Sequence, residues 1–206
     1  MTLAPLALSG LFLQCAPDVA PQTLNAIVSV ESARNPYVVA NVTDGTSHYF
    51  NDKEKAVTFL NKLEHDKKNY SAGIMQVNSA NFKSLNLNNN NVFDPCTNIR
   101  AGAVILKGCW ERAVSANPDE QKALRDAMSC YYSGNFTRGY KKESIDGKSY
   151  IQRIEEKTKV NSRYTVPAIK TDEKSNLPAP RPFMITEDSM NEWDVFGDYK
   201  EKHQSK

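Results

Sequence analysis

The residue best suited to acid–base chemistry is Glu31. It follows Ile27 and Val28 at helical spacing, which places it on or beside the buried face of a short helix that begins near Pro21. Burial and the C-terminal end of the helix dipole both disfavour a charged carboxylate there, so both raise its pKa. The sequence predicts a carboxylic acid that keeps its proton near neutral pH and acts as a general acid. The alternative is a glutamate paired with Arg34, one turn further on.

Other catalytic chemistries have few candidates in this chain. There are 3 histidines, so a Ser-His or Cys-His pair has few possible members. The 4 cysteines contain no C-x-x-C pair, which argues against zinc, and we expect no metal and no organic cofactor. Asp44 and Asp52 are the nearest candidates for a second acid, but we expect the first in a turn and the second at a helix cap.

The four cysteines, Cys15, Cys96, Cys109 and Cys130, are typical of two disulfides in an oxidising compartment. Cys96 and Cys109 are predicted to lie on one helix about 20 Å apart, which prevents them from pairing with each other. Two connectivities remain open.

The composition is that of an ordinary globular protein. The 206 residues include 26 basic and 24 acidic side chains, and this balance argues against nucleic acid or an anionic membrane as the main partner. Residues 3–13 have the length of an export-signal core, but no basic residue precedes them, and they are too short to span a bilayer. They are either an export signal or the first core helix, and we expect no transmembrane segment.

The elements that must position Glu31 are mainly helical. Helices are predicted from Pro21 to a stop at Asn35-Pro36, over 53–65 behind the cap Asp52, from Asp94-Pro95 onward, and again after Pro118-Asp119. Residues 38–50 alternate around Asp44-Gly45, which indicates a type I′ β-hairpin. Residues 70–82 are interpreted as a loop. The predicted fold class is α+β, mainly α, with one small β-hairpin.

The composition changes near residue 155. Four of the 10 prolines fall in the last quarter of the chain, which also lacks apolar periodicity. We therefore expect a globular domain over 1–155 and an extended, disordered, proline-containing tail over 156–206.

Several ordered motifs surround Glu31. They are E-S-A-R-N-P at 31–36, A-G-I-M-Q-V-N at 72–78, D-P and N-I within 94–99, C-Y-Y-S-G at 130–134, and Tyr150-Ile151. In order and spacing they resemble the E-S-x-x-N-P, G-L-M-Q-I, D-P-x-x-N-I and A-Y-N-x-G elements of the lysozyme-like family of lytic transglycosylases. The long interval before Gly73 and the opening QCAPDVAPQTL resemble the subgroup associated with type IV secretion and conjugation. The resemblance covers residues 12–155.

The resemblance implies a lysozyme-like fold and a function. The enzyme would cleave the β-1,4 bond between N-acetylmuramic acid and N-acetylglucosamine in peptidoglycan strands, leave a 1,6-anhydro product, and open the cell wall in the periplasm for a secretion apparatus. Glu31 would be its sole acid and base, because a reaction without water needs no second carboxylate. The tail would contact other secretion-channel subunits. The alternatives are a hydrolytic muramidase and a non-catalytic glycan-binding assembly protein of the same fold.

The resemblance also implies a substrate-binding wall opposite Glu31, formed by 73–78. Gly73 would let a sugar approach the backbone, Met75 would give an apolar surface, and Gln76 would hydrogen-bond the sugar or orient the acid. Asn78 belongs to the same wall. For Met75 the alternative is ordinary core packing.

Five further positions carry expectations. Ser32 would bond the glutamate or the substrate acetamide, unless it only bonds the local backbone. Tyr131 and Tyr150 are expected to face Glu31, with aromatic packing as the alternative for Tyr150. Tyr132 stands where the motif has an asparagine that contacts the substrate. Asn135 is expected to substitute for that asparagine. The resemblance also favours disulfides over free thiols.

Overall fold

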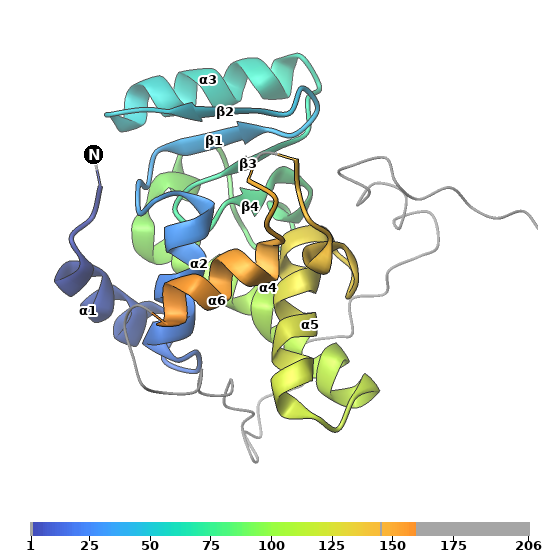
Figure 1. Cartoon of the computed structure of the whole chain (residues 1–206). Helices are drawn as coiled ribbons and strands as arrows, with labels where there is room; N and C mark the ends of the chain where they lie inside the picture. Colours follow the sequence, from blue (N-terminus) through green and yellow to red (C-terminus); the bar gives the residue numbers. More distant parts are fainter. Residues whose placement is uncertain (1, 145, 160–206) are drawn as a thin grey trace, which may run out of the picture.

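The computed structural model describes residues 2–144 and 146–159. Its helices are α1 (Pro5–Cys15), α2 (Pro21–Glu31), α3 (Lys53–His65), α4 (Pro95–Ala116), α5 (Glu120–Ser133) and α6 (Tyr150–Lys159), and its strands are β1 (Val38–Asn41), β2 (Thr46–Tyr49), β3 (Tyr70–Ala72) and β4 (Val77–Asn78). Figure 1 shows the sheet and α3 at one end of the molecule and the other helices at the opposite end. The predicted fold class, mainly helical α+β of the lysozyme-like type, is confirmed.

Helix α2 begins with Pro21 as predicted and ends at Glu31, earlier than the stop expected at Asn35-Pro36. The chain leaves the helix because Ala33 and Arg34 adopt left-handed backbone angles, with φ of 50° and 66°. The backbone amide of Arg34 then donates to the carbonyl of Val28 at 3.2 Å, which satisfies a carbonyl at the helix end. Glu31 is therefore the last helical residue.

Three aspartates begin the other long helices, as their positions in the sequence predict. Asp52 accepts a hydrogen bond from the amide of Lys55 at the start of α3, and Asp94 accepts one from Thr97 at the start of α4. Asp119 caps α5 in the same way. Helix α4 is 22 residues long and contributes many of the buried side chains of the core. Each cap satisfies amides that have no partner within the helix.

Helix α1 belongs to the hydrophobic core. Leu8 and Phe12 are buried within it, and the helix packs on α2 and α4. Of the two interpretations of residues 3–13, the first core helix matches this packing. No helix in 2–144 or 146–159 has both the length and the apolar character needed to cross a membrane.

The sheet is larger than the single hairpin predicted. In the described residues the antiparallel strand order is β2-β1-β3-β4, and β3 and β4 lie in the segment that we expected to be a loop. The hairpin of β1 and β2 is present, but its connection is the four residues 42–45 and only Gly45 has a positive φ, of 65°. A type I′ turn needs positive φ at two residues, so that prediction is wrong. The Asn41 side chain holds the loop by bonding the amide and carboxylate of Asp44.

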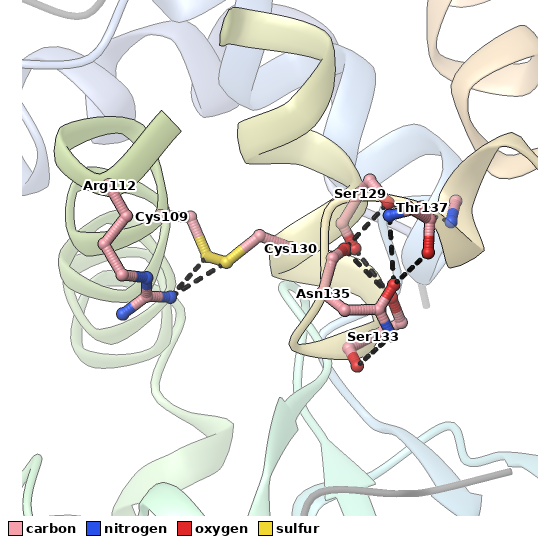
Figure 2. The surroundings of a disulfide bond; sticks show 8 residues. Cys109, Arg112, Ser129, Cys130, Ser133, Asn135 and Thr137 are labelled. Carbon is pink, nitrogen blue, oxygen red and sulfur yellow. Dashed lines mark hydrogen bonds between the residues drawn. A yellow bond between two sulfur atoms is a disulfide. The ribbon is translucent and has the colours of Figure 1, made fainter. Parts of the chain in front are cut away.

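Two disulfides select one of the two connectivities left open by the sequence. Cys15 pairs with Cys96 and joins α1 to α4, and Cys109 pairs with Cys130 and joins α4 to α5. Figure 2 shows the second disulfide, with the guanidinium of Arg112 donating towards both sulfur atoms. This cross-link fixes the part of α5 that carries Tyr131 and Tyr132 against α4.

The predicted domain boundary falls inside a helix. Helix α6 continues to Lys159, beyond residue 155, and packs on α2. The rest of the predicted tail, residues 160–206, lies outside the described residues.

Candidate active site

Glu31 and Tyr150 meet where α2 ends and α6 begins. The hydroxyl of Tyr150 donates to Oε1 of Glu31 at 2.5 Å. Tyr150 is 2% exposed, whereas Glu31 remains partly exposed. The expectation that Tyr150 faces Glu31 matches this geometry, and the carboxyl group has one oxygen engaged by a phenol inside the fold.

The surroundings of Glu31 favour its protonated form. Burial raises the pKa of this carboxyl group from its usual 4.5 to about 7. The Tyr150 hydrogen bond and the positive charge of Arg153 oppose this rise, and the negative charge of Glu143 adds to it. Near neutral pH the group is therefore divided between its acid and its carboxylate, which is the condition for a residue that both gives and takes a proton.

Tyr131, on α5, is also close enough to the acid to interact with it electrostatically. Its hydroxyl donates to the backbone carbonyl of Met75 at 2.5 Å. Burial, with a contribution from Glu31, raises the pKa of Tyr131 well above its usual range. The residue stays neutral and connects α5 to the segment 73–78.

A second group of polar residues lies beside Tyr150. The ring of Tyr132 stacks on that of Tyr150, with centroids 4.4 Å apart and an angle of 14° between the planes. The Tyr132 hydroxyl donates to Glu143, which also pairs with Arg153. Arg153 donates in addition to Asp146 at 3.0 Å. Sequence reasoning missed Glu143 and Arg153, and the available signal was the position of Arg153 one helical turn after Tyr150.

The segment 73–78 is shaped by a buried asparagine that the motifs contain but to which we assigned no role. Asn98 accepts a hydrogen bond from the amide of Met75 at 2.7 Å and donates to the carbonyls of Ala72 and Val92. Gly73 has a φ of 87°, and a Cβ atom there would lie 2.2 Å from Nδ2 of Asn98. This internal contact requires the glycine, and the approach of a sugar that we expected there stays a prediction.

Two predicted substrate contacts prove to be buried. The Met75 side chain is fully buried beside Gly102, which is the core-packing alternative. The Ser32 hydroxyl donates to the carbonyl of Ile74 at 2.8 Å and to Val28 at 3.1 Å, so it is directed to backbone and not to Glu31. It links the end of α2 to the segment 73–78, and the expected contact with the acid is not made.

Gln76 and Asn78 also use their side chains to hold the chain in place. Nε2 of Gln76 donates to the carbonyls of Gly73 and Val38 at 2.7 and 3.0 Å. Asn78 donates to Asn69 at 2.8 Å and accepts from the amide of Ala80. These bonds stabilise the turn and the strand that follow Gly73, and the sugar contacts that we expected of both residues stay predictions.

The two candidates for a second acid, Asp44 and Asp52, lie in the hairpin loop and at the start of α3. Asp44 is held by Lys68, whose hydrogen bond lowers the pKa of that carboxyl, and by Asn41. Asp52 caps α3, where the amide of Lys55 lowers its pKa. Both interpretations as structural residues hold.

The structure differs from two further expectations about residues near the site, those for Arg34 and Asn135. Arg153, and not Arg34, is the cation that influences Glu31. Asn135, our substitute for the asparagine of the motif, accepts from the amides of Thr137 and Arg138 and so closes the turn after α5 (Figure 2). Its side-chain oxygen is committed to that turn.

Metal binding has no support in the described part of the chain. Residues 2–144 and 146–159 contain no group of three or more histidine, cysteine, aspartate or glutamate side chains arranged to hold an ion.

Comparison with known proteins defines the class. The family model of the transglycosylase SLT domain matches residues 12–153. The chain therefore belongs to the transglycosylase SLT domain family, as the motif resemblance implied.

Curated relatives of the chain are virB1 proteins, one of them named as a type IV secretion system protein. The type IV secretion system protein virB1 of Brucella abortus is 44% identical over 142 residues, which are 68% of this chain and 59% of that protein. Protein virB1 of Agrobacterium fabrum is 33% identical over 190 residues, 92% of this chain and 70% of that protein. The chain thus spans less than two thirds of the length of the Brucella relative. No solved structure matches the chain.

Proposed function

We propose that this protein is a peptidoglycan lytic transglycosylase in which Glu31 is the sole acid and base. The observation that carries the proposal is the pairing of Glu31 with the buried Tyr150, at 2.5 Å, in surroundings that raise the pKa of the acid to about 7. The substrate is the glycan strand, and the bond cleaved joins N-acetylmuramic acid to N-acetylglucosamine. Family membership supports this substrate class.

The reaction proceeds in two proton transfers. Glu31 gives its proton to the bridging oxygen, so that the N-acetylglucosamine side leaves with a hydroxyl group and positive charge develops at C1 of the muramoyl residue. The acetamido group of the substrate stabilises that charge. The Glu31 carboxylate then takes the proton of the C6 hydroxyl, O6 bonds to C1, and a 1,6-anhydro sugar forms without water. The Tyr150 hydroxyl favours the carboxylate between the two steps, because it donates to Oε1.

The state of the second carboxylate favours this reaction over hydrolysis. Glu143 is the carboxylate whose charge adds to the rise in the pKa of Glu31. One of its oxygens accepts from Tyr132 and the other pairs with Arg153, so each oxygen already has a partner within the protein. A muramidase with paired acids needs a carboxylate free to activate water.

The cellular role follows from the relatives. We propose that the enzyme opens the cell wall in the periplasm for a type IV secretion or conjugation apparatus, and that residues 156–206 contact other subunits of it. The name of the Brucella relative supports this role. The two disulfides support an oxidising compartment.

The test is digestion of purified sacculi by the full chain and by Glu31→Gln, followed by mass spectrometry of the soluble fragments. We expect 1,6-anhydro muropeptides from the wild type and a loss of at least about a thousandfold in rate for the variant. Products heavier by one water molecule would show the muramidase alternative. A folded wild type that releases nothing would leave the glycan-binding alternative, and an active Glu31→Gln would remove Glu31 from its role.

A further inference from the structure

Tyr132 departs from the asparagine of the family motif, and it connects Tyr150 to a pair of opposite charges. Its ring stacks on Tyr150 and its hydroxyl donates to Glu143. Glu143 in turn pairs with Arg153, which lies on the same helix as Tyr150. One network therefore joins α5, the segment before α6 and the first turn of α6.

We propose that Tyr132, Glu143 and Arg153 form a positioning network for the reaction of Glu31: they fix Tyr150 against the acid and set the charge that the acid experiences. This inference rests on the proposed function of Glu31. None of the three is a catalytic residue, since each acts on the acid through Tyr150 or through its charge.

The mechanical part of the network concerns the beginning of α6. Tyr150 is its first residue, and the first amides of a helix have no partners within the helix. The stacked ring of Tyr132 covers one face of Tyr150, and Arg153 ties the same turn to Glu143 and Asp146. These contacts hold the Tyr150 hydroxyl at its distance from Oε1 of Glu31.

The electrostatic part of the network depends on two charges of opposite effect. Arg153 lowers the pKa of Glu31 and Glu143 raises it, so the two charges of this ion pair act on the acid in opposite directions. Removing either one alone exposes the other.

The remaining groups that face Glu31 do not carry charge near neutral pH. Tyr131 and Tyr150 both have their pKa raised well above the usual range by burial. Helix α1, which also packs on α2, has no ionisable side chain apart from the disulfide-bonded Cys15, and the segment 73–78 has none. Glu143 and Arg153 are therefore the charges that decide the balance.

The electrostatic test compares the pH dependence of sacculus cleavage in four variants of the full chain. Glu143→Gln leaves Arg153 less neutralised, so we expect the alkaline limb of the profile to move to lower pH by roughly 0.5 pH unit. Arg153→Gln should move it to higher pH, and the profile of the double variant should lie between those of the two single variants. The matched control is Glu155→Gln, which removes a carboxylate from the ion pair between Arg125 and Glu155 that also joins α5 to α6.

The positioning test uses the ring of Tyr132. Tyr132→Phe keeps the stack and loses the bond to Glu143, so its kcat should fall by about threefold or less. Tyr132→Asn restores the residue of the family motif but removes the stack, and we expect its kcat to fall by tenfold or more with little change in KM. Full activity of Tyr132→Asn would overturn the positioning role.

Nuclear magnetic resonance of the Glu31 carboxyl carbon in the same variants separates this inference from the proposed function. Suppose that the wild type cleaves sacculi. If Glu143→Gln and Arg153→Gln then do not shift the alkaline limb of the activity profile and the Glu31 titration midpoint in opposite directions, the network inference is wrong. If the titrations move as stated while sacculi remain intact, the network holds and the proposed function fails.

Discussion

The two sides of Glu31 use polar residues for different purposes. On the side of α5 and α6, hydroxyl and charged groups act on the acid directly, as Tyr150 does at 2.5 Å, or through a neighbour. On the side of the segment 73–78, the polar side chains are turned to backbone, as Ser32 and Gln76 are. Both sides contain residues of the motifs, so membership of a motif does not tell whether a residue reacts or supports.

The difference has an energetic reason. The segment 73–78 leaves its carbonyls and amides in the interior, where each needs a partner, and Asn98, Ser32 and Gln76 supply them. The helices α5 and α6 satisfy their own backbones, so their side chains are available to the acid. Variants on the first side should therefore change stability, and variants on the second should change activity and its pH dependence.

The largest effect is expected for Gly73→Ala. The new Cβ atom would lie 2.2 Å from Nδ2 of Asn98 and 2.7 Å from the carbonyl of Val92, at a φ of 87°. We expect a loss of about 3 to 5 kcal/mol in the free energy of unfolding, measured by denaturant titration. Gly45→Ala is the control, since it also has a positive φ but open space around it. Equal losses in the two variants would show that the contact with Asn98 is not what requires the glycine.

The next effect is a gain in stability from Glu31→Gln, which sharpens the contrast between the two sides. The folded protein binds the proton of Glu31 more tightly than the unfolded chain, so stability is fully present below pH 4.5 and is lost as the pH rises through about 7. Glutamine does not titrate. At pH 8 the variant should be more stable by up to about 3 kcal/mol, and near pH 4 by almost nothing. A variant less stable than the wild type at pH 8 would contradict the assigned environment.

A smaller effect is expected for Ser32→Ala, beside the acid in sequence but on the supporting side. The carbonyl of Ile74 would lose its buried donor, at a cost of about 1 to 2 kcal/mol. Cleavage of sacculi below the unfolding temperature should stay within about threefold of the wild type. A loss of tenfold or more with unchanged stability would instead place Ser32 in the chemistry.

The smallest effect is expected for Asp44→Asn, the variant of a carboxylate remote from the network. Asp44 is held by Lys68 and Asn41 in the hairpin loop. Activity should remain within about twofold of the wild type, because surface ion pairs contribute little and the reaction needs one carboxylate. A strong loss of sacculus cleavage in this folded variant would break the single-acid mechanism.

Local signals carried most of the prediction of the fold. The caps Asp52, Asp94 and Asp119 and the helical periods depend on residues close in sequence, so they were found. Strands β3 and β4 have only 3 and 2 residues, which is too short for a periodic pattern to show. Strand β3 pairs with β1, which is distant in the sequence, and with β4 across a turn. The early end of α2 depends on positive φ at Ala33 and Arg34, which are not residues typical of that conformation.

The acid could be located from its helix and motif, but its neighbours could be located only in part. Tyr131 and Tyr150 were found because the motifs align them. Glu143 and Arg153 act on Glu31 through contacts between α2, α6 and the segment before α6. The spacing of Arg153 from Tyr150 was a signal, but it does not by itself distinguish Arg153 from a surface charge. The supporting role of Met75 and Ser32 required knowledge of what lies behind the segment 73–78.

The most direct test of the account is the titration of the Glu31 carboxyl carbon in the wild-type chain, with Glu31→Gln used to assign the signal. The account predicts a midpoint of about 7, set by burial against the opposing effects of Tyr150 and Arg153. A midpoint near 4.5, the ordinary value for a glutamate in water, would mean that Glu31 is ionised at neutral pH and has no proton to give to the glycosidic oxygen.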